Sequence, residues 1–193
     1  MRLFSRVKLV ELDTSSLSKR AIGDYLGEGH ALNIKVMHYF VDMLDFRGRG
    51  FVPALRSFLQ CFRLPGEAQK IDRLMEKFAD RYTENNPSIF AKSADIAYTM
   101  AYSVIMLNTD MYSTQVKNKM DKAAFIRNNR PIITSMENDK IEKFLEDIYD
   151  DIASREIVLE EEQLVFLNNN LPKSKPKLTQ GKRKNNRRWF SFK

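Results

Sequence analysis

The stretch FRLPGEAQKIDR, at residues 62–73, gives the strongest indication of the fold in this chain of 193 residues. A Pro65-Gly66 turn separates an apolar segment from a helix whose apolar residues at 71, 74, 75, 78 and 82 follow the 3.6-residue period. Glu67 directly follows the turn. A glutamate in the first turn of a helix is favoured by the helix dipole, by about 0.3–1 kcal/mol. The same placement also holds one carboxylate out from a rigid turn, where it is available to another molecule.

Segments on both sides of this stretch show the same helical period. We predict amphipathic helices over 34–44, 51–62 and 140–152, a short helix over 121–128 and a buried helix over 94–107. Ser93 and Asp121 are suited to cap the helices that follow them, and the run Asn85-Asn86-Pro87 to end the helix before it. No segment alternates apolar and polar residues as a strand does. The sequence therefore predicts an all-α fold.

Charge is distributed unevenly along the chain. The net charge is +7, but residues 171–193 hold nine Lys and Arg and no Asp or Glu, which leaves 23 basic against 25 acidic residues elsewhere. Such a nearly neutral body is not suited to follow a nucleic-acid backbone, so we expect no nucleic-acid partner. The composition over 166–193 predicts a basic, disordered tail.

The basic tail has three interpretations. Its composition is typical of a solvated, disordered end. It also suits contact with an anionic membrane, where each basic residue contributes about 1 kcal/mol. A nuclear-localisation or nucleic-acid patch is the third, although no recognition fold accompanies it. The membrane-contact candidates are Lys182, Arg183, Lys184, Arg187, Arg188 and Trp189.

Several classes of protein are disfavoured by composition. No apolar run is long enough for a membrane span, and residues 1–10 lack the apolar core of a signal peptide. The one cysteine, Cys61, cannot form an internal disulfide, which fits a reducing, cytoplasmic setting. His30 and His38 have no neighbours at metal-ligand spacing, so we expect no metal site.

Two motifs resemble a known family. Residues 62–73 match the signature of the Sec-seven domain, which catalyses nucleotide exchange in guanine-nucleotide exchange factors for Arf GTPases. The segment AYSVIMLNTD at 101–110 is similar to the second signature of that family, in the right order and at a fitting distance. Stretches at 22–29, 33–37 and 116–120 resemble the large brefeldin A-inhibited subgroup. The resemblance extends from about residue 17 to residue 159.

The resemblance implies a right-handed superhelical array of about eight to ten helices in two subdomains. We place the exchange domain at 17–165, between a diverged extension at 1–16 and the tail at 166–193. Residues 1–16 do not resemble the helices that begin the family domain. We therefore expect those helices to be missing and apolar surface to be exposed in the N-terminal half.

The resemblance implies a function that makes and breaks no covalent bond. Glu67 matches the glutamate finger, which is inserted near the β-phosphate and Mg²⁺ of Arf–GDP, expels GDP and promotes GTP loading in vesicle trafficking. A hydrophobic groove binds Arf, and its residues here are Phe62, Leu64, Asp72, Tyr98, Met106 and Asn108. The exchanger needs no cofactor of its own, because the nucleotide and Mg²⁺ belong to Arf. The expected location is cytoplasmic, at the periphery of Golgi or trans-Golgi membranes.

Four residues match those shared by brefeldin A-sensitive members of the family: Tyr102, Ser103, Asp110 and Met120. The resemblance implies that the drug traps this domain in an unproductive complex with Arf–GDP. An alternative is a non-catalytic Arf-binding module, because of the shortened N-terminus. A third hypothesis is a basic membrane or nucleic-acid adaptor that works through the tail. The intact Glu67 favours catalysis.

Overall fold

The computed structural model describes residues 18–114, 116–133 and 138–159, and every regular element in these ranges is a helix. The predicted all-α fold is therefore confirmed. The elements are seven α-helices and one 3-10 helix: α1 (Lys19–Gly27), α2 (Ala31–Asp42), α3 (Phe51–Leu59), α4 (Ala68–Asn85), α5 (Ala94–Tyr112), α6 (Lys122–Asn129), η2 (Arg130–Ile132) and α7 (Asn138–Ser154).

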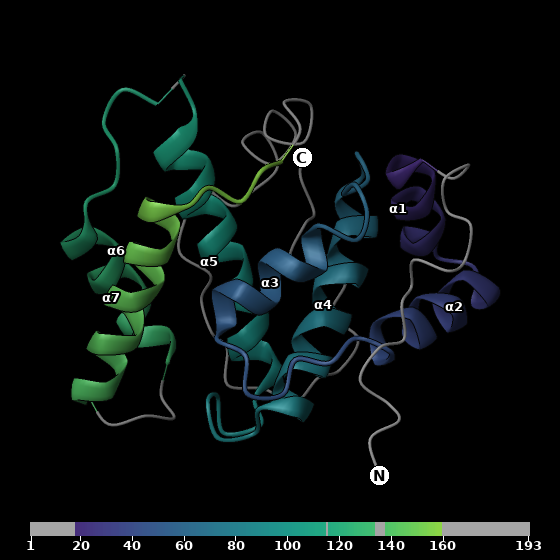
Figure 1. Cartoon of the computed structure of the whole chain (residues 1–193), viewed down its shortest axis with the longest axis horizontal. Coiled ribbons are helices and arrows are strands. Elements are labelled where there is room, and N and C mark those ends of the chain that lie inside the picture. Colours follow the sequence, from purple (N-terminus) through teal and green to yellow (C-terminus); the bar gives the residue numbers. More distant parts are fainter. Residues whose placement is uncertain (1–17, 115, 134–137, 160–193) are drawn as a thin grey trace, which may run out of the picture.

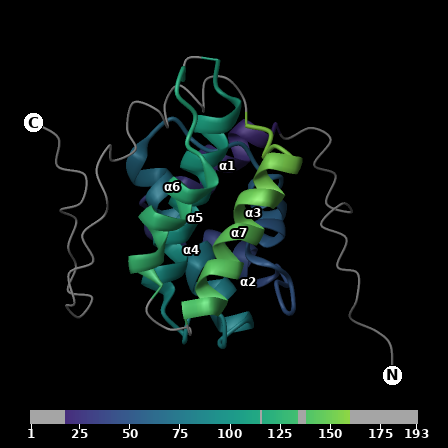
Figure 2. The same cartoon turned by 90° about the vertical axis from the view of Figure 1, so that its left-hand side faces the viewer.

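The helices α4 and α5 pack along each other at the centre of the molecule (Figure 1). At one end, α1 and α2 pack on each other and on α4; at the other, α6 and α7 pack on each other and on α5. Figure 2 views the molecule from the α6 and α7 end. Because α3 contacts both α4 and α7, it joins the centre to the α6 and α7 end.

An aromatic cluster forms the centre of the core. The rings of Phe58 and Phe78 stack with centroids 5.0 Å apart, and Phe51 meets Tyr82 edge to face at the same separation. The Tyr82 hydroxyl donates a hydrogen bond of 3.1 Å to the Arg49 carbonyl, so its polar end is satisfied although the side chain is buried. Edge-to-face aromatic pairs contribute about 0.5–1.5 kcal/mol beyond the area they bury.

The helix boundaries follow the capping residues that the sequence predicts. The Ser93 hydroxyl accepts a hydrogen bond from the Ile96 N–H at the start of α5, and Asp121 accepts one from Ala124 at the start of α6. α4 ends before Asn86, whose side-chain amide donates to the Phe46 carbonyl at 2.8 Å. These predicted caps and this predicted helix end are confirmed.

A largely buried ion pair joins α3 to α7. The Arg56 side chain in α3 is only 7% exposed, and its guanidinium contacts the Asp151 carboxylate in α7 at 2.6 Å. The same guanidinium donates to the Glu156 carbonyl at 2.5 Å. Removing one partner of such a pair is strongly destabilising, because the remaining charge is left in a low-dielectric interior.

One helix has apolar residues on the surface as well as in the core. Met37 and Val41 of α2 are buried, but Leu32, Val36, Tyr39 and Met43 are 36–75% exposed, and we call these four residues the outer face of α2. Among the described residues, nothing covers this face. None of the helices described is both long enough and apolar enough to span a bilayer.

Candidate functional site

Glu67 lies at the tip of an elbow, residues 62–67, between α3 and α4. Its backbone carbonyl accepts the first hydrogen bonds of α4, from the Lys70 and Ile71 N–H groups at 3.0 and 3.1 Å. Its side chain makes no capping hydrogen bond and is 69% exposed. Two residues before it in the elbow, Phe62 and Leu64, are buried, at 2% and 4% exposed. The elbow therefore holds an exposed carboxylate on a buried base.

The helix α1 supports this elbow through close backbone contact. A Cβ atom on Gly23 would lie 1.8 Å from the Arg63 carbonyl oxygen, and one on Gly27 would lie 2.7 Å from the Lys70 Cβ. The Arg63 N–H donates to the Lys19 carbonyl at 2.9 Å. Only glycine lets α1 approach so closely, because any side chain there would displace the elbow.

An ionic cluster lies beside Glu67. The Lys70 ammonium contacts the Glu28 carboxylate at 2.6 Å and the Glu67 carboxylate at 3.1 Å. These two contacts raise the pKa of Lys70, and the hydrogen bond that the ammonium donates to Glu28 has the larger effect. The hydrogen bond with Lys70 lowers the pKa of the Glu28 carboxyl. Lys70 and Glu28 were not among the predicted site residues, because 42 positions separate them in the sequence.

Asp72 and Tyr98, predicted from different motifs, are in contact. The Tyr98 hydroxyl of α5 donates a short hydrogen bond to the Asp72 carboxylate of α4, and the Tyr98 and Tyr102 rings meet edge to face at 5.0 Å. Burial raises the pKa of the Asp72 carboxyl, although the hydrogen bond from Tyr98 opposes this shift. Burial also raises the pKa values of both tyrosines. The site thus combines two neutral aromatic side chains with a carboxyl group whose charged form is disfavoured.

The predicted residues of α5 form one stripe. Tyr98, Tyr102, Met106 and Asp110 are spaced four apart, which places them on one side of the helix, and all four are partly buried. Ser103, also partly buried, is next to Tyr102 in the chain. The Asp110 carboxylate accepts a hydrogen bond of 2.6 Å from the Met120 N–H. The four predicted brefeldin A determinants therefore lie along α5 and the segment that Asp110 holds against it.

The family model described as the Sec7 domain matches residues 6–157. The chain belongs to the Sec7 domain family. The all-helical architecture and both signature motifs of a Sec7 domain thus occur together here, and the resemblance inferred from the two motifs is confirmed. The family match begins before the first helix described.

Curated relatives of this Sec7 domain include Arf exchange factors. It is 54% identical over 152 residues to the ADP-ribosylation factor guanine nucleotide-exchange factor SEC7 of Saccharomyces cerevisiae, covering 79% of this chain and 7% of that protein. It is 55% identical over 152 residues to brefeldin A-inhibited guanine nucleotide-exchange protein 2 of Arabidopsis thaliana, covering 79% of this chain and 8% of that protein. The chain thus spans less than a tenth of the length of these relatives.

Solved structures agree with the fold. The crystal structure of the Sec7p catalytic domain superposes with a TM-score of 0.67 and 52% sequence identity, covering 75% of each chain. A structure of ARF1-GDP bound to a Sec7 domain complexed with brefeldin A matches with a TM-score of 0.65 and 33% identity, covering 78% of this chain and 74% of that one. This chain is therefore homologous to domains that act in Arf exchange factors and that bind ARF1-GDP.

Three of the predicted partner-binding residues of this Sec7 domain do not face solvent. Phe62 packs edge to face on Phe58 with centroids 5.1 Å apart, and Leu64 is buried beside it in the elbow. Asn108 is fully buried, and its amide exchanges two hydrogen bonds with the backbone of Ile157, at 2.7 and 3.0 Å. Because these side chains are enclosed, direct contact with a partner is not supported, and we assign them to support of the site.

Other predictions cannot be placed in the structure. The membrane-contact candidates at 182–189 and the segment 1–16 lie outside the described residues. The predicted boundaries at 16–17 and 165–166 lie there too and stay predictions. No group of three or more His, Cys, Asp or Glu side chains in the described ranges is placed to hold a metal ion.

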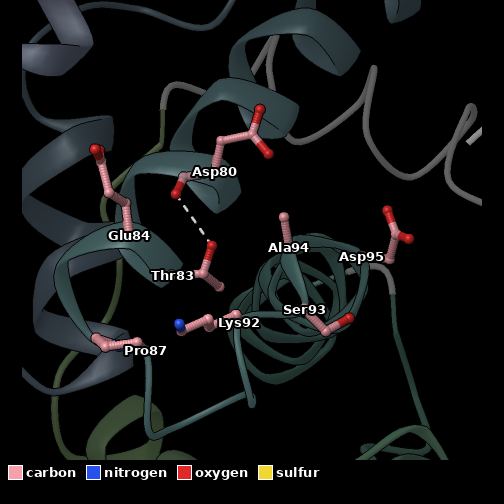
Figure 3. A pocket seen from close by; sticks show the side chains of 8 residues that line it. All are labelled: Asp80, Thr83, Glu84, Pro87, Lys92, Ser93, Ala94 and Asp95. Atoms are coloured by element: carbon pink, nitrogen blue, oxygen red, sulfur yellow. Dashed lines mark hydrogen bonds between the residues drawn. The ribbon is translucent and has the colours of Figure 1, made fainter.

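A pocket lies at the far end of α4 from Glu67 (Figure 3). Asp80, Glu84, Asp95 and Lys92 are among the residues that line it. The helix has 18 residues and is therefore about 27 Å long, so the pocket is remote from the elbow. Its Thr83 hydroxyl donates to the Asp80 carbonyl within α4. We leave this pocket out of the candidate site.

Proposed function

We propose that this domain catalyses the exchange of GDP for GTP on an Arf-family GTPase, with Glu67 as the group that is inserted near the β-phosphate and Mg²⁺. One observation carries this proposal: Glu67 is 69% exposed at the tip of an elbow in which Phe62 and Leu64 are buried. These buried side chains fix the backbone from which the carboxylate extends toward another molecule. Less of the chain then has to be ordered as the charge approaches its target.

The electrostatics of a closing interface give the size of the effect. Two unit negative charges about 4 Å apart repel by about 1 kcal/mol in bulk water and by about 4 kcal/mol at an effective dielectric constant of about 20. Since about 1.4 kcal/mol is tenfold, excluding water raises the effect from about fivefold to about 10³-fold. Glu67 also competes with the phosphate for Mg²⁺, whose charge dominates a nucleotide site.

The α5 stripe is proposed to bind the GTPase. Tyr98, Tyr102 and Met106 present partly buried apolar surface beside Asp72, and apolar side chains of the GTPase pack there. This binding is coupled to nucleotide release in both directions, so the domain binds nucleotide-free GTPase most tightly. The proposal assigns no cofactor to this chain, because GDP, GTP and Mg²⁺ belong to the GTPase.

Three finer features belong to the same proposal. Brefeldin A binds at Tyr102, Ser103, Asp110 and Met120 in the complex with Arf–GDP, in keeping with the drug-inhibited relatives and the drug-bound neighbour. The basic tail contacts anionic lipid. The protein works in the cytoplasm, at the periphery of Golgi membranes.

Release of GDP from an Arf protein lacking its N-terminal helix, followed by fluorescence, tests the proposed activity. The wild-type chain is expected to accelerate release, brefeldin A to reduce this acceleration, and Glu67→Lys to abolish it. Glu84→Lys is the matched control, because Glu84 is a 66% exposed glutamate at the other end of the same helix. Circular dichroism checks that each variant is folded.

The outcomes separate catalysis from binding alone. A folded wild-type chain that does not accelerate release contradicts exchange activity. If that chain still captures nucleotide-free Arf on beads, it is a non-catalytic binding module. Equal activity in wild type and Glu67→Lys leaves exchange in place and removes Glu67 from its mechanism.

A further inference from the structure

Glu28, Lys70 and Glu67 form an ionic cluster in which the two ion pairs differ in length and the three side chains differ in exposure. Lys70 lies closer to Glu28, at 2.6 Å, than to Glu67, at 3.1 Å. The Lys70 side chain is 11% exposed, whereas those of Glu28 and Glu67 are 39% and 69% exposed. The ammonium is thus enclosed and anchored on Glu28, while Glu67 lies at the open edge of the cluster.

Lys70 cannot follow Glu67 into another molecule. Its stem packs against α1 so closely that a Cβ atom on Gly27 would lie 2.7 Å from the Lys70 Cβ. Next to it, the Arg73 guanidinium donates to the Gly27 carbonyl at 2.5 and 2.9 Å. These contacts fix the stem of Lys70 and the guanidinium of Arg73 to α1. Moving Glu67 toward a nucleotide therefore means breaking its contact with Lys70.

We propose that Glu28 is a positioning residue that releases Glu67: by holding the Lys70 ammonium, it lets the Glu67 carboxylate leave the cluster and enter the nucleotide site. This inference rests on the proposed exchange function and adds a residue that governs the movement of Glu67. When Glu67 leaves, Glu28 still neutralises Lys70, so no uncompensated charge remains on the enclosed ammonium. Without Glu28, Glu67 is the one carboxylate of the described ranges that remains in ion-pair contact with Lys70, and it is held back.

Lys70 is not the only cation close to Glu28. Arg73 also acts on Glu28 by attraction, so the cluster holds a second cation besides Lys70. Removing the Glu28 charge therefore leaves Glu67 facing a more positive cluster. The extra attraction that holds Glu67 in the cluster is expected to be modest, because contacts between partly exposed charges are weak.

A double-mutant cycle in the GDP-release assay tests the proposal. Glu28→Gln is expected to slow exchange by about two- to fivefold, the range typical of partly exposed ion pairs. The double variant Glu28→Gln with Lys70→Gln is expected to return to the rate of Lys70→Gln alone. Because Glu28 and Lys70 are in contact, their effects are not expected to add. The deciding result is a double variant that exchanges faster than Glu28→Gln alone, since a purely structural loss of the ion pair is not repaired by removing its second partner.

The variants are chosen to keep the fold. Glutamine retains the shape of Glu28, and the backbone hydrogen bond from Glu28 to the Tyr25 carbonyl does not involve the side chain. Asp147→Asn is the matched control, since it removes one carboxylate from another lysine ion pair of 2.6 Å, on α7. This control is expected to exchange at the wild-type rate.

A measurement without the GTPase keeps this inference separate from the proposed function. In an NMR titration, the pKa of the Lys70 ammonium is expected to fall further in Glu28→Gln than in Glu67→Gln. The contact with Glu28 is the shorter one, and the hydrogen bond donated to Glu28 is the larger cause of the raised pKa. Equal falls overturn the idea that Glu28 is the main anchor. This result is independent of any exchange activity.

The outcomes then divide clearly. Slower exchange in Glu28→Gln, with rescue by Lys70→Gln and the larger fall in pKa, supports the positioning role. Unchanged exchange in Glu28→Gln, or a double variant slower than both single variants, overturns it while leaving exchange by Glu67 in place. An inactive wild-type chain contradicts the exchange function, and the positioning role with it, even if the titration shows that Glu28 anchors Lys70.

Discussion

The elbow and α2 use apolar residues in opposite ways. In the elbow, Phe62 and Leu64 are enclosed and the charged Glu67 is exposed. In α2, Met37 and Val41 are enclosed, but Tyr39 and the rest of the outer face are exposed apolar side chains. Both segments contain apolar residues, at helical spacing in α2 and two residues apart in the elbow. Periodicity therefore shows which residues share a side, whereas burial depends on what packs against that side.

The difference concerns the neighbours of each segment. The elbow is enclosed by α1 on one side and by the aromatic core on the other. The outer face of α2 has no such neighbour in the ranges that the structure describes. A helix with apolar residues on two sides is usually buried on both. The expected exposure of apolar surface in the N-terminal half is thus found on α2.

The largest effect that tests this comparison is expected at Gly23. Its Cβ would lie 1.8 Å from the Arg63 carbonyl, so Gly23→Ala forces α1 away from the elbow and lowers the free energy of unfolding by about 3 kcal/mol. Gly66→Ala is the control, because no atom lies within 4 Å of the position of its Cβ. Urea unfolding measures both. Similar midpoints for the two variants would show that α1 does not determine the geometry of the elbow.

A smaller effect is expected at Asp72. Burial raises the pKa of the Asp72 carboxyl above its ordinary value, so the folded state binds a proton more readily than the unfolded state. The free energy of unfolding therefore falls as pH rises from the ordinary pKa of an aspartate through the raised pKa of Asp72. Asp72→Asn removes the buried charge and is expected to stabilise the fold at neutral pH by up to about 1 kcal/mol. It is also expected to weaken binding of the GTPase.

Urea unfolding at neutral pH and below the ordinary pKa of an aspartate checks this prediction. The advantage of Asp72→Asn should vanish in acid, because the wild-type carboxyl is then also neutral. An advantage that stays constant with pH would mean that the buried charge is not its cause.

The smallest effect is expected on the outer face of α2. Tyr39 is 75% exposed, so Tyr39→Ser should change the free energy of unfolding by no more than about 0.5 kcal/mol. Val41→Ser is the control on the same helix, since Val41 is fully buried and its replacement should cost about 2 kcal/mol or more. A loss above 1 kcal/mol for Tyr39→Ser would show that residues outside the described ranges cover this face.

Local patterns predicted most of the helices. Five predicted segments and the 71–82 period correspond to α2 to α7, and Ser93 and Asp121 cap helices as expected. The period did not reveal α1, because Gly23 and Gly27 occupy positions that face the core and contribute no apolar side chain. These glycines serve close approach to a distant segment, which a local pattern cannot indicate.

The candidate site was predicted less completely than the fold. The exposure of Glu67 agrees with its predicted place after a turn. The contact between Asp72 and Tyr98 joins two helices, and that between Glu28 and Lys70 joins α1 to α4, so neither follows from helical spacing. The burial of Asn108 is a further example, because its partner Ile157 is 49 residues away.

The buried contacts of Arg56 bear on how the chain folds during its synthesis. Arg56 reaches Asp151 and Glu156, which are 95 and 100 residues later in the chain. A ribosome making about 5–20 residues per second takes several seconds to add the last of these partners. Throughout that interval Arg56 keeps its charge in water, and α3 lacks its contact with α7. The enclosed guanidinium therefore delays completion of the core until the segment that holds Asp151 and Glu156 has been made.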